Sequence, residues 1–256
     1  MNIRTDGLLN PYLLEVTDTK IVVLVEEFCY KIRKGRIAKL VVSRPDYVLQ
    51  DMKIILEQPT HLSFPVIYEK DGQVYVMPEN SKGGGINIYR YNAESERLDL
   101  VHEVGHLPLT DATIVKFHSG EEYVFSTKLP NPNGNELEIY PFDGESMKMD
   151  VKSLAAVSFP SNIARNAGDA FYIGEQMFRP AQDCNKCYGN GLNIQQVNSV
   201  GGKFELKTVN EFHSDNPDYG LGYHTFNIKN GLIVVDGHRY RFPRIVKLLH
   251  ILSKLK

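Results

Sequence analysis

Five polar residues that could bind a ligand or exchange a proton recur along the 256-residue chain at nearly equal intervals. Each lies seven to nine residues before a predicted hairpin turn: Asn10, Ser63, Asp111, Arg165 and His224. A carboxylate can act as a general acid or base, and an arginine offers a planar fork to carboxylates and phosphates. Amide, hydroxyl and imidazole groups exchange hydrogen bonds with hydroxyl groups. Brought to one place, these side chains would form a site for a polyhydroxylated or anionic ligand.

A second set of polar residues follows the same turns, at the end of the next predicted strand. Its members are Glu26, Glu27, Glu79, Arg179, Gln182, Asp183 and Asp236. Consecutive strands of a hairpin are antiparallel, so the start of the first strand and the end of the second share one edge. From both sets we predict three catalytic residues, Asp111, Asp183 and Glu79. We predict a larger group of substrate-binding residues: Asn10, Glu27, His61, Ser63, Arg165, Arg179, Gln182, Tyr188 and His224.

Simpler explanations exist for these positions. Polar residues are common where strands begin, because loops are polar. Aromatic residues beside them could stack on sugar rings or could be ordinary core residues, and these are Tyr12, Phe64, Tyr188 and Tyr223. The sequence alone leaves both interpretations open.

The elements that must position these residues form a repeat. An apolar run, a tight-turn signal and a second apolar run recur with turns centred near residues 18, 72, 120, 174 and 231. Third and fourth strand-like runs follow each hairpin except the last. Four antiparallel strands in a repeat of roughly 40–50 residues are typical of a propeller blade. The sequence therefore predicts an all-β, five-bladed β-propeller with four-stranded antiparallel blades; a β-sandwich or an open meander is the alternative.

We predict that residues 1–256 form a single propeller domain. Its blades span about residues 10–59, 60–107, 108–158, 159–213 and 214–246, and the N-terminus closes the last blade. In residues 244–256 the apolar side chains repeat with helical spacing, which predicts a short C-terminal helix with basic residues off the apolar face. That helix could pack on the propeller or make a peripheral contact with a membrane surface.

Composition excludes some classes of function. The net charge of −2 lacks the basic excess of nucleic-acid-binding proteins, so no nucleic-acid partner is expected. No signal-peptide core and no apolar run of membrane-spanning length are present, which predicts a cytoplasmic protein, free or peripheral to the membrane. Cys184 and Cys187 have the spacing C-x-x-C, but no second pair would complete a zinc site and no βαβ context favours a redox pair.

Several short motifs together resemble a known family. They are "HLSFP" (61–65), "MPEN" (77–80), "TDAT" (110–113), "RPAQDCNKCYG" (179–189), "HTFN" (224–227) and "VVDG" (234–237). In this order they are similar to the five-bladed propeller domain at the N-terminus of glucosamine inositolphosphorylceramide transferases. That domain resembles the superfamily of family-43 glycoside hydrolases, arabinanases and levansucrases. The resemblance runs from about Asn10 to Gly237, and "RPAQDC" followed by "YG" is its most specific part.

The resemblance implies a carbohydrate-active protein of surface glycan metabolism, glycosidase-like or glycosyltransferase-like. Its ligand would be a carbohydrate or a nucleotide-sugar-derived molecule in the central funnel. The alternatives are a glycan-binding propeller that has lost catalysis and a protein-interaction platform. Hydrolases of the superfamily use one carboxylate from each of the first three blades, and the matching positions here are Asn10, a residue near Ser63, and Asp111. The usual triad is incomplete, so Asp111 with Glu79 or Asp183 is the remaining acid–base pair.

The resemblance requires no cofactor. Some superfamily members hold a cation in the channel beside a histidine of the last blade. His224 is at the matching position, so a central cation such as calcium is the one expected metal; the other interpretation is a hydrogen-bonded structural histidine.

Overall fold

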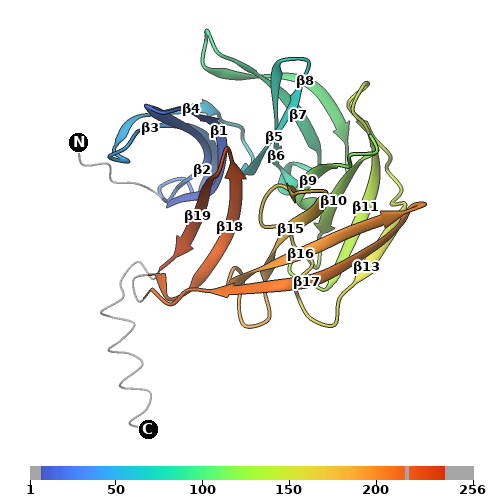
Figure 1. Ribbon diagram of the computed structural model, residues 1–256. Helices are drawn as coiled ribbons and strands as arrows, with labels where there is room; N and C mark the ends of the chain where they lie inside the picture. Colours follow the sequence, from blue (N-terminus) through green and yellow to red (C-terminus); the bar gives the residue numbers. More distant parts are fainter. Residues whose placement is uncertain (1–6, 217–218, 240–256) are drawn as a thin grey trace.

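The computed structural model describes residues 7–216 and 219–239, which form an all-β propeller of antiparallel sheets (Figure 1). Blade one contains β1 (Gly7–Val16), β2 (Lys20–Cys29), β3 (Lys34–Ser43) and β4 (Leu49–Leu56). Blade two contains β5 (Ser63–Lys70), β6 (Gln73–Glu79), β7 (Ile86–Asn92) and β8 (Arg97–Gly105). Blade three contains β9 (Leu109–Lys116), β10 (Glu122–Lys128), β11 (Glu136–Asp143), β12 (Lys148–Met149) and β13 (Ala155–Ser158). Blade four contains β14 (Phe171–Ile173), β15 (Gln176–Asp183), β16 (Gly191–Val200) and β17 (Lys203–His213).

The last described sheet has two strands, β18 (Gly222–Lys229) and β19 (Leu232–His238). The prediction of five four-stranded blades is therefore wrong: the described residues form four blades and this two-stranded sheet. β1 pairs with β2 as the first strand of blade one, so it does not complete the last sheet. The difference arises because no strand follows β19 within the described residues. The helix predicted for residues 244–256 lies outside the described residues.

Side chains of the two-stranded sheet connect it to blade one. Asn227 Nδ2 donates to the Pro11 carbonyl at 2.8 Å, and Lys229 Nζ donates to the Leu14 carbonyl at 2.9 Å. On its other side, the Phe226 N–H donates to the Ala167 carbonyl at 2.7 Å. The sheet thus lies between blade one and the chain that leads into blade four, as Figure 1 shows.

The hairpin turns form where glycine and its predecessor can adopt left-handed backbone. Asp71 and Gly72 have φ of 50° and 71°, and Asn230 and Gly231 have φ of 50° and 74°. Two consecutive positive φ values are the signature of the type I′ turn, whose twist matches that of the flanking strands. The Asp-Gly and Asn-Gly signals in the sequence thus predict these turns correctly.

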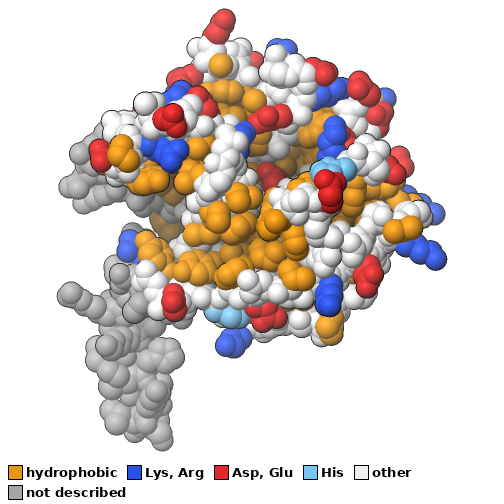
Figure 2. Space-filling model, in the orientation of Figure 1, with side chains coloured by type: hydrophobic (Ala, Val, Ile, Leu, Met, Phe, Trp, Pro, Cys, Tyr) orange, Lys and Arg blue, Asp and Glu red, His pale blue; other side chains and the backbone are white. Residues whose placement is uncertain are grey.

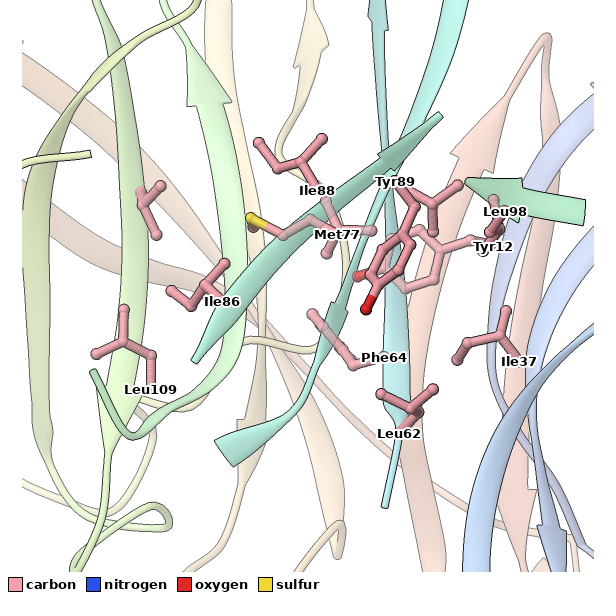
Figure 3. Packing of buried hydrophobic residues seen from close by; sticks show 14 of the residues in the cluster. Tyr12, Ile37, Leu62, Phe64, Met77, Ile86, Ile88, Tyr89, Leu98 and Leu109 are labelled. Carbon is pink, nitrogen blue, oxygen red and sulfur yellow. The ribbon is translucent and has the colours of Figure 1, made fainter. Parts of the chain in front are cut away.

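The largest core cluster lies between blades one, two and three (Figure 3). The rings of Tyr12 and Phe64, from the first strands of blades one and two, meet edge to face with centroids 5.3 Å apart. Both residues are buried among aliphatic side chains such as Ile37 and Met77. Tyr12 and Phe64 are therefore core residues and not surfaces for a sugar ring.

Each of the first three blades begins with a bulge. Asn10, Phe64 and Asp111 have φ of 52°, 46° and 47°, and the pairing register shifts beside each of them. Positive φ is costly for residues other than glycine, and bulges of this kind re-aim side chains and backbone N–H groups. These three residues therefore occupy equivalent places in the three blades.

Apolar side chains remain exposed near the incomplete sheet. Ile233 and Val235 of β19 are about half exposed, and Figure 2 shows hydrophobic side chains gathered over β18 and the neighbouring strands β16 and β17. The described residues contain one short 3-10 helix, η1 (Ser81–Gly83). No helix among them has the length and hydropathy to span a membrane.

Candidate functional site

A network of polar side chains joins the blades at one end of the channel, where the first strands begin. Asp111 is at its centre: Oδ2 accepts from Arg165 Nε at 2.6 Å and from Gln182 Nε2 at 2.9 Å. The Arg165 guanidinium also donates to Asn133 Oδ1 at 2.8 Å and lies 4.8 Å above the centre of the Tyr188 ring. Residues of blades three and four and of the loops beside them are thus held around one guanidinium.

The network continues through the two-stranded sheet into blade one. The Tyr188 hydroxyl contacts His224 Nε2, and His224 Nδ1 lies 2.9 Å from Asp236 Oδ2. Asp236 Oδ2 accepts the Asn10 N–H at 2.9 Å, and Asn10 Nδ2 donates to a carboxyl oxygen of Glu26 at 2.9 Å. Polar groups far apart in the sequence therefore form one continuous set of contacts.

His61 extends this set on the Glu26 side. Its Nδ1 accepts the Gly35 N–H at 2.9 Å, so the proton of the neutral ring is on Nε2, which lies 3.5 Å from Glu26 Oε1. Burial and the charge of Lys82 lower the pKa of His61, which favours this neutral form. His61 can therefore act as a hydrogen-bond donor beside Glu26.

The carboxyl groups also connect neighbouring blades. Asp236 accepts the Asn10 N–H, and Glu79 Oε2 accepts the Asp111 N–H at 2.9 Å. In both cases a carboxyl at the end of a second strand binds the N–H that a bulged residue of the next sheet exposes. Glu26 has the corresponding place in blade one, but it contacts the Asn10 side-chain amide and His61.

Burial and neighbouring charges give the three acids of the network, Glu26, Glu79 and Asp111, different protonation states. Burial, Glu79 and Asp111 together raise the pKa of Glu26 to about 8. Burial and the Asp111 charge raise the pKa of Glu79 as well. Burial opposes ionisation of Asp111, but the Arg165 guanidinium outweighs it and holds the pKa of Asp111 below its usual value. Near neutral pH the site therefore combines an ionised Asp111–Arg165 pair with two carboxyl groups that retain protons.

Most of the predicted site residues come together here, namely Asn10, His61, Glu79, Asp111, Arg165, Gln182, Tyr188 and His224. Ser63 is buried and pairs in register with Glu79, next to the bulged residue Phe64. The blade-two residue equivalent to Asn10 and Asp111 is thus Phe64, one position beyond the predicted Ser63.

Three predicted residues lie elsewhere. Adjacent strand residues point to opposite faces, so Glu27 faces away from the side on which Glu26 lies. It pairs with Arg36, whose Nε donates to Glu27 Oε2 at 2.9 Å. Arg179 is fully buried inside blade four, where it donates to Asn166, Gln195 and the Ala164 carbonyl. Internal acceptors hold its guanidinium, so Arg179 supports the network from behind: its partner Asn166 donates to the Asp111 carbonyl at 2.7 Å.

Asp183 faces the turn that follows it. Its Oδ1 accepts from the Asn185 N–H at 2.9 Å and from Asn185 Nδ2 at 2.7 Å, while Oδ2 lies 3.8 Å from His213 Nε2. This is the arrangement of an Asx turn, in which an aspartate shapes its own loop. Asp183 is consequently not paired with Asp111.

Glu26, Asp236 and His238 belong to the site although they are absent from the predicted set of site residues. Glu26 and Asp236 stand among the second-strand ends that the sequence places at this edge, but counting could not show which of two adjacent acids faces the channel. His238 lies beside His224, with ring centroids 4.7 Å apart. Side chains two residues apart on a strand share a face, so the spacing of Asp236 and His238 on β19 is the signal that could have identified His238.

The residues around His224 do not fit the expected calcium ion. One ligand atom each from His224, Asp236 and His238 lies within 4.8 Å of the others. Calcium prefers six to eight oxygen ligands, whereas two of these three donors are imidazole nitrogens. These three side chains are therefore not a calcium site by themselves; the expected channel cation, held mainly by water beside one histidine, stays a prediction.

The network is largely closed to solvent. Asn10, Glu26, Asp111 and His224 are buried, and the aromatic ring beside them, Tyr188, is 40% exposed. A cavity of about 690 Å³ lies at the opposite ends of the strands, between the turns of blades two and three, and is lined by residues such as Tyr68, Glu122 and Asp143. The accessible parts of the polar site are thus Tyr188 and, to a smaller extent, His61, whose side chain is 25% exposed.

The architecture and the site define a class: a β-propeller of antiparallel blades with a polar network at one end of its channel. The chain belongs to the family described as glucosamine inositolphosphorylceramide transferase 1, N-terminal, whose model matches residues 5–226. The family predicted from the sequence motifs is thereby confirmed.

Relatives and solved structures are consistent with this assignment. Glucosamine inositolphosphorylceramide transferase 1 of Arabidopsis thaliana is 29% identical over 165 residues, which are 62% of this chain and 21% of that protein. The protein of the same name from Oryza sativa subsp. japonica is 25% identical over 166 residues, 61% of this chain and 21% of the relative. The chain thus corresponds to about a fifth of the length of these relatives.

Similar folds are found among family-43 glycoside hydrolases. A thermostable family-43 glycoside hydrolase superposes with a TM-score of 0.66 at 13% identity, covering 93% of this chain and 85% of that one. An α-L-arabinofuranosidase from Clostridium thermocellum gives 0.63 at 13% identity, with 97% and 86% covered. At this identity the similarity shows the fold alone.

Proposed function

We propose that this propeller binds a sugar beside Tyr188 and His61 and does not itself cleave or transfer it. One observation carries the proposal: the three equivalent bulged positions of blades one to three hold Asn10, Phe64 and Asp111. The hydrolases that the sequence resembles place a carboxylate in each of these blades. Neither an amide nor a phenyl ring exchanges protons near neutral pH.

The remaining acid is engaged in the fold. Asp111 Oδ2 accepts from both Arg165 and Gln182, and the side chain is buried. Glu79 Oε2 lies 3.7 Å from the same guanidinium. Inverting hydrolysis needs two carboxyl groups about 6.5–9.5 Å apart with a water between them. Here Glu79 and Asp111 flank one arginine instead, which favours binding over hydrolysis.

The accessible side of the network suits a sugar. An aromatic ring exposed beside hydrogen-bonding groups can pack on the apolar face of a pyranose, and Tyr188 presents 40% of its surface next to Arg165 and His224. The named transferase relatives support a carbohydrate as the ligand. A glycan or a nucleotide-sugar-derived molecule of surface glycan metabolism is the class we assign.

Glycosyl hydrolysis or transfer is the second candidate, and Glu26 is the observation that favours it. With its pKa near 8, this carboxyl holds a proton at neutral pH and could donate it to a leaving group.

A combined binding and turnover screen tests both candidates. Nucleotide sugars, aryl glycosides and oligosaccharides are titrated calorimetrically into the full chain, and the same mixtures are assayed for product. We expect at least one sugar to bind without product, with binding weakened roughly tenfold by Tyr188→Ala because the stacking surface is lost. Tyr47→Ala, which removes an exposed tyrosine of blade one, is the matched control. Product that Glu26→Gln abolishes would establish the second candidate, and absence of any binding would contradict both.

A further inference from the structure

His224, Asp236 and His238 form a compact set of metal-ligand side chains in the two-stranded sheet. Asp236 and His238 are two residues apart on β19, so they point to the same face, and β18 places His224 opposite them, where Thr225 pairs with Asp236. One ligand atom of each lies within 4.8 Å of the others, and His224 and Asp236 are buried.

Two of these side chains are already fixed in position. Asp236 accepts the Thr225 N–H at Oδ1 and the Asn10 N–H at Oδ2, at 2.6 and 2.9 Å. His224 contacts the Tyr188 hydroxyl through Nε2, which leaves Nδ1 facing Asp236 Oδ2 at 2.9 Å. Metal bonds of about 2.0–2.1 Å that meet at roughly 90–110° separate two ligand atoms by about 2.9–3.4 Å. The spacing of Nδ1 and Oδ2 therefore also suits two ligands of one ion.

The third side chain has an unmet requirement. His238 Nε2 is buried and has no hydrogen-bond partner in the described part of the chain. A buried polar atom without a partner is costly, and a role in binding an ion is one of its ordinary explanations. Gly189 supports the arrangement, because a Cβ there would stand 3.2 Å from His238 Cε1 and 3.3 Å from the His224 Cβ.

The donor chemistry selects the kind of ion. Two imidazoles and one carboxylate suit zinc and other divalent first-row transition metals, while calcium requires oxygen ligands. We propose that His224, Asp236 and His238 bind one divalent transition-metal ion. In this site the His224 ring binds through Nδ1 and donates its Nε2–H to the Tyr188 oxygen, the outer-shell contact that orients metal-bound histidines. Because Asp236 also holds the Asn10 N–H, the ion fastens the two-stranded sheet to blade one, independently of any sugar.

Metal titration of the full chain, stripped with chelator and free of any histidine tag, tests the site. We expect one Zn²⁺ per chain with a dissociation constant of about 1 μM or tighter. We also expect the Tm to rise by roughly 5–10 °C at a hundredfold excess over that constant. Ca²⁺ at millimolar concentration is expected to give neither effect. His238→Ala should weaken Zn²⁺ binding at least tenfold, and His213→Ala, an exposed histidine beside Asp183, should leave it unchanged.

Coordination is read separately from affinity. Co²⁺ in place of Zn²⁺ should give visible d–d absorption in the wild type and not in His238→Gln, whose circular dichroism shows whether the chain is folded. Wild-type protein that binds no Zn²⁺ at 100-fold molar excess would overturn the proposal. So would Zn²⁺ binding unaffected by His238→Ala, or Ca²⁺ binding tighter than Zn²⁺.

Discussion

Glu26 is a residue of the polar network whose protonation state the fold controls. Burial, Glu79 and Asp111 raise its pKa from 4.5 to about 8. Between these two values the folded protein holds a proton that the unfolded chain has released. The stability that Glu26 contributes is therefore complete below about pH 4.5 and is lost progressively as the pH rises to about 8.

Glu26→Gln should remove this pH dependence. A glutamine keeps an oxygen for the Asn10 amide but cannot ionise, so the variant should gain on the wild type as the pH rises from 5 to 8. For one proton, the difference in unfolding free energy grows by at most about 1.4 kcal/mol per pH unit. Urea unfolding at pH 5, 6, 7 and 8 measures it, with the exposed Glu94→Gln as control. Parallel stability curves for Glu26→Gln and wild type would contradict the raised pKa.

At the level of single residues, the sequence could predict which residue types gather at this end of the channel but not which side chains face it. Counting back from the predicted turns identified four of these residues: Asn10, Asp111, Arg165 and His224. The choice between Glu26 and Glu27 was not, because a one-residue change moves a strand side chain to the other face. The bulge that makes Phe64, and not Ser63, the equivalent of Asn10 has no local signal that we could identify.

At the scale of single elements, the hairpin turns carry the clearest information. Asn230 and Gly231 connect β18 and β19 with φ of 50° and 74°. A left-handed conformation costs a residue with a Cβ roughly 1–2 kcal/mol, and glycine avoids this cost. The turn thus depends on glycine for backbone reasons alone, since a Cβ at Gly231 would meet no atom within 4 Å.

Gly231→Ala is therefore expected to lower the unfolding free energy by about 1–2 kcal/mol without any clash. Gly105→Ala is the matched control: a Cβ there also meets nothing within 4 Å, but its backbone is not left-handed. The control should be neutral or slightly stabilising, because alanine restricts the unfolded chain. Both are measured by urea unfolding at one pH, and equal effects of the two changes would refute the argument from φ.

Secondary structure was predicted correctly where it depends on a few neighbouring residues. Asp71-Gly72 and Asn230-Gly231 are turn signals that a short stretch of sequence supplies by itself. The number of strands in each sheet is set by pairing between segments, which spacing alone does not determine. Residues 148–158 show this, because they supply two short strands, β12 and β13, that both pair with β11.

At the scale of the whole molecule, the question is how the ring of sheets is held closed. The equal spacing of turns predicted sheets around one channel, and that part of the prediction is confirmed. It also predicted a complete fifth blade, whereas β18 and β19 stand as a two-stranded sheet among the described residues. A two-stranded sheet is marginal by itself, so its contacts with blade one and with the chain before blade four must stabilise it.

Asn227 makes both of these contacts. It is buried, its Nδ2 donates to the Pro11 carbonyl at 2.8 Å, and its Oδ1 accepts the Asp169 N–H at 2.8 Å. Asn227→Ala would leave two backbone groups unpaired, at a cost of about 1–3 kcal/mol each if they stay buried. The cost should fall on the two-stranded sheet first, because regions open locally according to their own stability.

Native-state amide hydrogen exchange tests this on the full chain. In Asn227→Ala, protection of β18 and β19 should fall at least tenfold, which corresponds to about 1.4 kcal/mol. Protection of β10 and β11 in blade three should stay within twofold of wild type, and the exposed Asn198→Ala of β16 should change neither region. Exchange that accelerates equally in blade three and in the two-stranded sheet would mean that the ring opens as one unit. In that case Asn227 would stabilise the whole propeller, and the two-stranded sheet would not open independently of the blades.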